Sequence, residues 1–97
     1  MTPEDAEIIE WDDHNEAHLA GHGLTYWDVY DVLSDPVVFV PNRRNGSDRW
    51  KILGYGRGGR ALTIVCAYDS VRRSLRPITG WDTTPDERTR YLKGDRR

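Results

Sequence analysis

The sequence predicts a small α+β domain, in which helices pack on a small antiparallel sheet meander. Two helical patterns come first, a series of apolar strands follows, and a short capped helix closes the chain. A length of 97 residues suits one domain spanning residues 1–97. Hydrophobic residues make up only 37% of the chain, but four Trp and five Tyr bury large areas, so we expect a modest folded core.

The first quarter of the chain is predicted to hold a short strand and a helix. Residues 7–11 (EIIEW) are few and favour an edge strand. Asp13, with Glu16 three residues later, forms a capping-box pattern that starts a helix. Gly21 and Gly23 are expected to end this helix, because glycine is common just after the last helical turn.

A second helix is predicted to begin at Thr25, whose hydroxyl can cap a helix and which is followed by Asp28 three residues later. Its apolar face is expected to contain the residues that recur at helical spacing, namely Tyr26, Val29, Tyr30 and Leu33. Asp35-Pro36 ends the helix, since the residue before a proline avoids the helical conformation.

The hydrophobic period then changes to that of strands. Residues 37–40 favour a first strand, and alternation over residues 49–54 places Trp50 and Ile52 on one face, with Arg49, Lys51 and Leu53 on the other. Residues 61–68 are almost wholly apolar, which predicts a central strand covered on both faces. Residues 73–80 favour a fourth strand, in which Pro77 indicates an edge or a bulge.

The last helix has the clearest local signal in the chain. Thr84 supplies a capping hydroxyl, Pro85 takes the first helical position and Glu87 completes a capping box. A short helix is therefore predicted here. The two ends of the chain, residues 1–5 and 94–97, are expected to be frayed.

Charge is segregated along the chain. Residues 1–41 contain ten Asp and Glu and no Lys or Arg, whereas residues 42–97 contain all 14 Lys and Arg against six acids. Two interpretations stay open: an acidic and a basic face that are merely solvated, or a basic surface that binds a phosphate backbone. No apolar run reaches membrane-spanning length and no signal peptide is evident, so a cytoplasmic protein is expected. Cys66 lies in an apolar run and is predicted to be a small buried residue, with no disulfide.

Two familiar patterns are better explained structurally. Residues 54–59 match G-x-G-x-x-G, but a strand rather than a helix follows, so a hairpin loop is predicted instead of a dinucleotide site. His14, His18 and His22 recur every four residues, but Gly21 ends the helix before the third histidine and no further ligand completes a zinc set. We therefore expect no metal and no cofactor.

Cationic side chains on or beside the predicted sheet suggest an RNA-cleaving surface. Arginines there would hold the scissile phosphate and stabilise the negative charge of the transition state. The catalytic candidates of this kind are Arg49, Arg60 and Arg76, and the RNA-binding candidates are Lys51 and Arg73. The alternative is a solvated sheet face whose long side chains lie along apolar surface.

Acid–base groups for such a reaction are also present. His22 lies in a glycine-flanked turn and is of the residue type that titrates near neutral pH. Glu87 and Tyr91 lie four residues apart on the last helix and could exchange protons with the 2′-hydroxyl and the leaving oxygen. A capping role for Glu87 and packing of Tyr91 on the sheet are equally adequate explanations.

The order of residues resembles the BrnT toxin family from about Glu10 to Tyr91. The resemblance depends on short pieces at matching spacing: Glu10-Trp11-Asp12, Asn15, His22-Gly23, Asp35-Pro36, Arg49, Gly54, Gly59-Arg60, Arg76, Ile78-Thr79, and Glu87-Arg88 with Tyr91. It implies a RelE-like fold and a metal-independent ribonuclease toxin of a type II toxin–antitoxin system, which inhibits translation. It also implies a BrnA-like ribbon-helix-helix antitoxin as partner, through which operator DNA is bound, and RNA as substrate. Charge segregation predicts that this antitoxin covers the basic sheet surface.

The chain departs from the family pattern at two positions. Trp81 stands where the family has an arginine two residues after the position of Thr79, and Pro77 replaces an aliphatic residue. If the missing arginine contacts phosphate, cleavage should be weak. If Arg76 or Arg73 has taken over that role instead, Trp81 could stack on an RNA base. A third interpretation is that Trp81 simply caps the core beside the last helix. The alternative functions are therefore a catalytically weakened BrnT-like domain that acts as co-repressor with its antitoxin, or a basic RNA-binding module.

Overall fold

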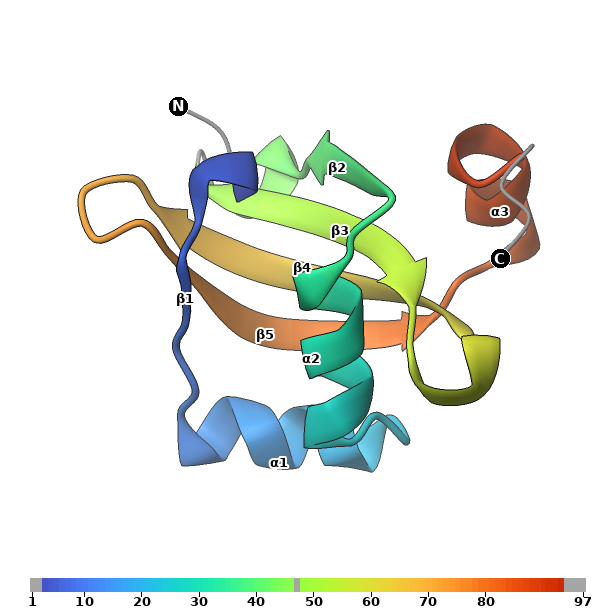
Figure 1. Ribbon diagram of the computed structural model, residues 1–97, viewed down its shortest axis with the longest axis horizontal. Coiled ribbons are helices and arrows are strands. Elements are labelled where there is room, and N and C mark those ends of the chain that lie inside the picture. The colour runs from blue at the N-terminus through green and yellow to red at the C-terminus, as the bar shows by residue number, and fades with distance from the viewer. Residues whose placement is uncertain (1–2, 47, 94–97) are drawn as a thin grey trace.

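The computed structural model describes residues 3–46 and 48–93, and within these ranges the chain forms three α-helices and one five-stranded sheet (Figure 1). The helices are α1 (Asp13–Gly21), α2 (Tyr26–Ser34) and α3 (Pro85–Tyr91). The strands are β1 (Ile8–Ile9), β2 (Val38–Pro41), β3 (Arg49–Tyr55), β4 (Ala61–Asp69) and β5 (Ser74–Asp82). Short 3₁₀ turns are η1 (Pro3–Asp5), η2 (Arg43–Asn45) and η3 (Arg57–Gly59). The predicted α+β class is confirmed.

The sheet has the strand order β1-β5-β4-β3-β2. Strands β2 to β5 form the expected antiparallel meander. The first strand departs from the prediction of an antiparallel sheet, because β1 pairs in parallel with β5 through Ile8 and Ser74. The backbone N–H groups of Glu7 and Glu10 donate to the carbonyls of Arg73 and Leu75, each at 2.8 Å. The short β1 thereby satisfies part of the free edge of β5 and makes the sheet mixed.

Side-chain caps fix the starts of the helices. The capping boxes predicted at Thr25 and Thr84 are both present. In α1 the capping residue is Asp12 rather than Asp13: its carboxylate accepts a hydrogen bond of 2.8 Å from the backbone N–H of Asn15. Asp12 has the extended backbone that a helix cap requires, whereas Asp13 already belongs to the first turn.

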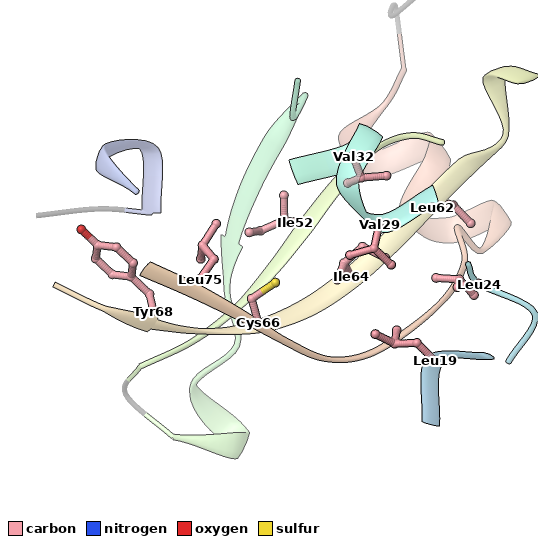
Figure 2. Packing of buried hydrophobic residues seen from close by; sticks show 10 residues of the cluster. All are labelled: Leu19, Leu24, Val29, Val32, Ile52, Leu62, Ile64, Cys66, Tyr68 and Leu75. Atoms are coloured by element: carbon pink, nitrogen blue, oxygen red, sulfur yellow. The ribbon is translucent and has the colours of Figure 1, made fainter. Parts of the chain in front are cut away.

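The main core lies between one face of the sheet and the helices α1 and α2. Figure 2 shows Val29 and Val32 of α2 pointing toward Ile52, Leu62 and Ile64 of the sheet. This arrangement corrects the predicted apolar face of α2 in part. Val29 is buried and Leu33 packs against the core as expected, but the two tyrosines are exposed and Val32 faces the sheet instead. A smaller cluster on the opposite sheet face, around Leu53, is covered by Tyr91 of α3 and by Leu92, which follows it.

The centre of the sheet matches the prediction. Every residue from 61 to 68 is buried, as expected for a strand covered on both faces. The ladder between β4 and β5 shifts register between Val65 and Cys66, opposite Pro77, which confirms the predicted bulge. Cys66 is fully buried, also as predicted, and this burial raises the pKa of its thiol.

The N-terminal segment is more ordered than the sequence indicates. Residues 3–5 form a 3₁₀ turn in which Pro3 is buried, so fraying is the wrong prediction for them. The same prediction for residues 1–2 and 94–97 lies outside the described residues. Among the helices of residues 3–46 and 48–93, none is long and apolar enough to cross a membrane.

Candidate nucleic-acid interface

Three cationic side chains belong to the sheet face opposite α1 and α2. Along β3, Trp50 packs against the main core, so alternation places its neighbours Arg49 and Lys51 on the other face. The strand register places Arg76 of β5 in the same row as Arg49, with Ala67 of β4 between them. We call Arg49, Lys51 and Arg76 the cationic face.

The three members of the cationic face differ in how far their charge is already neutralised. Arg49 Nη1 lies 2.9 Å from Asp48 Oδ1, and Lys51 Nζ lies 3.1 Å from Glu87 Oε2. Arg76 is exposed and has no ion pair among the described residues. Because its guanidinium gives up no existing partner, Arg76 is the member best able to bind an external phosphate.

A groove of ≈ 450 Å³ extends the cationic face toward the edge of the sheet. Val40 of β2 pairs with Lys51, and η2 contributes Arg43 and Arg44 to the same groove, which Tyr91 of α3 closes on the other side. We call it the β2 groove. Sequence reasoning missed the two arginines of η2, because the polar loop that contains them has no periodicity to indicate a face. The signal that could have indicated them is that two arginines stand side by side in a loop between two predicted strands.

Glu87 lies at the centre of a hydrogen-bond network that joins α3 to the sheet. Its Oε1 accepts hydrogen bonds from Thr63 Oγ1 at 3.1 Å, Trp81 Nε1 at 2.9 Å and the Thr84 backbone N–H at 3.1 Å. Its Oε2 accepts a hydrogen bond from Lys51 Nζ at 3.1 Å. The side chain of Glu87 is 9% exposed, so its carboxylate makes its hydrogen bonds inside the protein.

This network determines what Glu87 can do chemically. Burial by itself raises the pKa of the carboxyl group, but the hydrogen bonds from Trp81, Thr84 and Lys51 outweigh burial and leave the pKa below its ordinary value. A general base for neutral pH needs a pKa near neutrality and a free lone pair. Glu87 is therefore better placed to hold Trp81 and Lys51 in position than to accept a proton from RNA. Tyr91, in the β2 groove, remains the acid–base candidate beside the cations.

Two further catalytic candidates, Arg60 and His22, lie at the other end of the molecule. Arg60 donates from Nε and Nη2 to the Asp82 carboxylate, at 2.6 and 3.1 Å, and from Nη1 to the Gly23 carbonyl at 3.1 Å. Asp82 is six residues along β5 from Arg76, or about 20 Å at the rise of a strand. Arg60 thus ties the turn between α1 and α2 to the sheet, and the structure does not bring it together with Arg76.

The histidines form contacts of their own. The rings of His18 and His22 meet edge to face with centroids 4.8 Å apart, and His18 Nε2 lies 3.0 Å from Thr79 Oγ1. No group of three or more His, Cys, Asp or Glu side chains that could hold a metal ion occurs in residues 3–46 and 48–93. The G-x-G-x-x-G segment leads through η3 into β4, so a strand follows it, as predicted.

Arg73 occupies the turn before β5, where its backbone has a φ of 54°. Its Nη1 lies 3.4 Å from Glu7 Oε1, next to β1. The predicted RNA-binding residues are therefore divided. Lys51 belongs to the cationic face, and Trp81 donates a hydrogen bond to Glu87, the same carboxylate that pairs with Lys51. Arg73 lies at the other edge of the sheet, where it pairs with Glu7 beside β1.

Comparison with family models and with curated proteins does not identify the chain. It matches no family model and no curated protein. The resemblance to the BrnT family therefore stays a prediction from the residues. Any function has to be inferred from the cationic face and the β2 groove.

Proposed function

We propose that the chain binds RNA across the cationic face and the β2 groove and cleaves it without a metal ion, as the toxin of a toxin–antitoxin pair in the cytoplasm. The observation that carries this proposal is the row of Arg49 and Arg76 on a sheet face that α1 and α2 leave uncovered, continuous through Lys51 with two more arginines in a groove. Such a surface favours an extended, flexible polyanion, and single-stranded RNA fits this description.

The proposed chemistry uses the groups at the groove. Attack by the 2′-oxygen forms a bond to phosphorus and breaks the bond to the 5′-oxygen, while negative charge builds on the phosphate. Lys51 and the arginines would stabilise that charge. The Tyr91 phenol borders the same groove and would protonate the leaving oxygen. The 2′-hydroxyl proton would go to solvent water, since Glu87 is engaged, and we expect slow cleavage for that reason.

A second candidate function is a BrnT-like domain that has lost catalysis and acts as co-repressor with a BrnA-like antitoxin. One observation favours it: Glu87, the one carboxylate among the predicted catalytic residues, has its oxygens occupied and its pKa lowered. His22 and Arg60, which the resemblance also implies, lie away from the cationic face. This candidate predicts RNA or partner binding without cleavage.

The test measures binding and cleavage of a labelled single-stranded RNA of about 15 nucleotides in the presence of chelator. Arg76→Ala should weaken binding and lower the slope of log affinity against log salt by about 0.7, the value for one lost phosphate contact on a single strand. Arg57→Ala is the matched control, because it removes an equal charge beside α2. Equal effects of the two variants would contradict a localised site. Tyr91→Phe should slow cleavage without changing affinity, and binding without any cleavage would favour the co-repressor.

Trp81→Arg tests whether the missing family arginine limits the rate. A guanidinium there would lie beside Glu87 and the cationic face, and restoring one donor to a developing charge is worth about 10²–10³ in rate. We expect faster cleavage with unchanged affinity for the product. The melting temperature is measured in parallel, because Trp81 also donates to Glu87. An unchanged rate in the folded variant would refute a catalytic role for this end of the sheet.

A further inference from the structure

The outer side of α2 carries an exposed cluster of aromatic rings. Trp27 is 54% exposed, Tyr30 42% and Tyr26 38%. The ring of Tyr26 contacts Trp11 with centroids 4.7 Å apart, Trp27 at 5.0 Å, and Tyr30 in a nearly parallel arrangement at 6.3 Å. We call Tyr26, Trp27 and Tyr30 the aromatic surface. Val29 and Val32, on the other side of the helix, pack α2 against the sheet.

The aromatic surface continues into a groove beside β1 that is lined by both apolar and polar residues. Tyr30 borders this groove of ≈ 340 Å³, together with Leu33 of α2, Leu75 of β5 and Ile8 of β1. Ile8 is itself 52% exposed. Contiguous exposed apolar area of this kind is typical of protein–protein interaction sites, because it is costly to leave in water.

Charge indicates what kind of segment fits there. The aromatic surface and β1 belong to the part of the chain with ten acids and no Lys or Arg, and the acids beside them attract arginines from the rest of the chain: Asp31 pairs with Arg57 and Glu7 with Arg73. Arg57 shows how a cation binds: its guanidinium carbon lies 5.2 Å from the centroid of the Trp27 ring, and its Nε lies 3.0 Å from Asp31 Oδ2. A ring face and a carboxylate together thus hold a guanidinium, and among the described residues the rings of Tyr26 and Tyr30 have no such cation.

We propose that the aromatic surface and the groove beside β1 bind a segment of a partner polypeptide that carries arginines among apolar residues. The arginines stack on the tyrosine rings, and the apolar residues enter the groove. Under the proposed function this partner is the antitoxin, but the inference depends on the helix side of the molecule and not on RNA cleavage. The aromatic surface lies on the other side of the sheet from the cationic face, so one partner could occupy both without competition between its segments.

The probes are three synthetic peptides of about ten residues that alternate leucine with arginine, lysine or glutamate. Binding to the isotope-labelled full chain is followed by the shifts of backbone and indole N–H signals. We expect the Leu-Arg peptide to shift signals of α2, β1 and the Trp27 indole, the Leu-Lys peptide to bind several-fold more weakly because its ammonium groups stack less well, and the Leu-Glu peptide not to bind.

Variants separate ring contacts from general charge attraction. Trp27→Ala with Tyr30→Ala keeps every charge and should raise the dissociation constant by on the order of tenfold. Trp27→Leu with Tyr30→Leu keeps apolar volume without π faces and should abolish the preference for arginine over lysine. Val71→Ala is the matched control, because Val71 is an apolar side chain 90% exposed outside the aromatic surface. Melting curves confirm that each variant is folded.

Three results would overturn the proposal: peptide shifts that map to the cationic face, equal affinity of the ring variants and Val71→Ala, or equal binding of the three peptides. A fourth contradicting result would come from sedimentation of the chain without peptide: if the chain self-associates and the ring variants abolish this, the partner on the aromatic surface is a second copy of the chain. RNA binding by the same ring variants should be unchanged. Failure of this proposal is therefore distinguishable from failure of the proposed function, which Arg76→Ala tests.

Discussion

Replacing Glu87 should destabilise the fold more than any exposed charge change on α3. Its carboxylate accepts hydrogen bonds from Thr63, Trp81 and Thr84 and pairs with Lys51, with all four heavy-atom distances between 2.9 and 3.1 Å. In Glu87→Ala the Thr63 hydroxyl retains a possible partner in Thr83, but the Trp81 indole N–H loses its acceptor. An unpaired donor in a mostly buried position costs about 1–3 kcal/mol.

The expected loss can be estimated from these contacts. Losing the capping-box acid costs about 1 kcal/mol, and the indole N–H left without an acceptor adds about 2 kcal/mol. Lys51 is 24% exposed and can recover hydrogen bonds to water. Glu87→Ala should therefore lower the free energy of unfolding by about 3 kcal/mol, which corresponds to roughly 15 °C in melting temperature for a domain of this size. Glu87→Gln keeps the shape and loses the charge, so about 1–2 kcal/mol is expected.

The assay is urea denaturation followed by tryptophan fluorescence, with Asp86→Asn as matched control. Asp86 is an acid of the same helical turn, but its side chain is 80% exposed and lies 3.9 Å from Arg90, so its loss should cost less than about 0.5 kcal/mol. A Glu87→Ala protein within 0.5 kcal/mol of the unsubstituted chain would refute the conclusion that this network holds α3 on the sheet.

Acidification gives the same prediction a second readout. Because the folded pKa of Glu87 is lowered, the stability that its ionised form contributes is fully present above its ordinary value near 4.5 and is lost as pH falls through the folded pKa. The difference between the unsubstituted chain and Glu87→Gln should accordingly be constant from pH 7 to about 5 and shrink in more acidic solution. A difference that grows on acidification would contradict the assigned direction.

Three further predictions follow from other contacts. Arg60→Ala should lower the free energy of unfolding by about 1 kcal/mol in urea denaturation, because it removes a bidentate pair with the Asp82 carboxylate and a hydrogen bond to the Gly23 carbonyl. Arg90→Ala removes only an ion pair at 3.9 Å and should be near neutral, so equal effects would contradict the structural role of Arg60. Gly80→Ala should destabilise by at least about 2 kcal/mol, since its Cβ would lie 2.9 Å from both a backbone oxygen and an isoleucine methyl, whereas Gly21→Ala has open space and should stabilise by about 0.5 kcal/mol. Cys66 should react with a thiol reagent on the order of 100-fold more slowly in the native protein than in urea, and similar rates would contradict its burial.

Local signals in this sequence were sufficient where the contacts that matter are local. The hydroxyls of Thr25 and Thr84 and the acids three residues after them form their capping boxes within one turn, so spacing alone predicts them. Alternation along β3 similarly places Trp50 on the face opposite Lys51. Parallel pairing of β1 was not predictable in this way, because it depends on a strand more than sixty residues away along the chain.

The candidate site shows the same limit more strongly. Residue type made Arg60, Arg76 and Glu87 equal candidates, but their partners lie far along the chain: Asp82 is 22 residues from Arg60, and Lys51 is 36 residues from Glu87. These long-range partners decide whether a charge is used inside the fold or offered to a ligand. By this criterion Arg76 is available, whereas Arg60 and Glu87 are committed to the structure.

The two proposed surfaces lie on opposite sides of the central sheet, and this has an electrostatic consequence. The α2 layer alone is about 10 Å thick, which exceeds the screening length of about 8 Å at physiological salt. An arginine-bearing segment on the aromatic surface therefore changes the potential at Arg76 very little. A partner that prevents RNA binding has to cover the cationic face physically, with an acidic or helical segment of its own. A partner that contacts the aromatic surface alone would therefore stay bound while RNA occupies the other side.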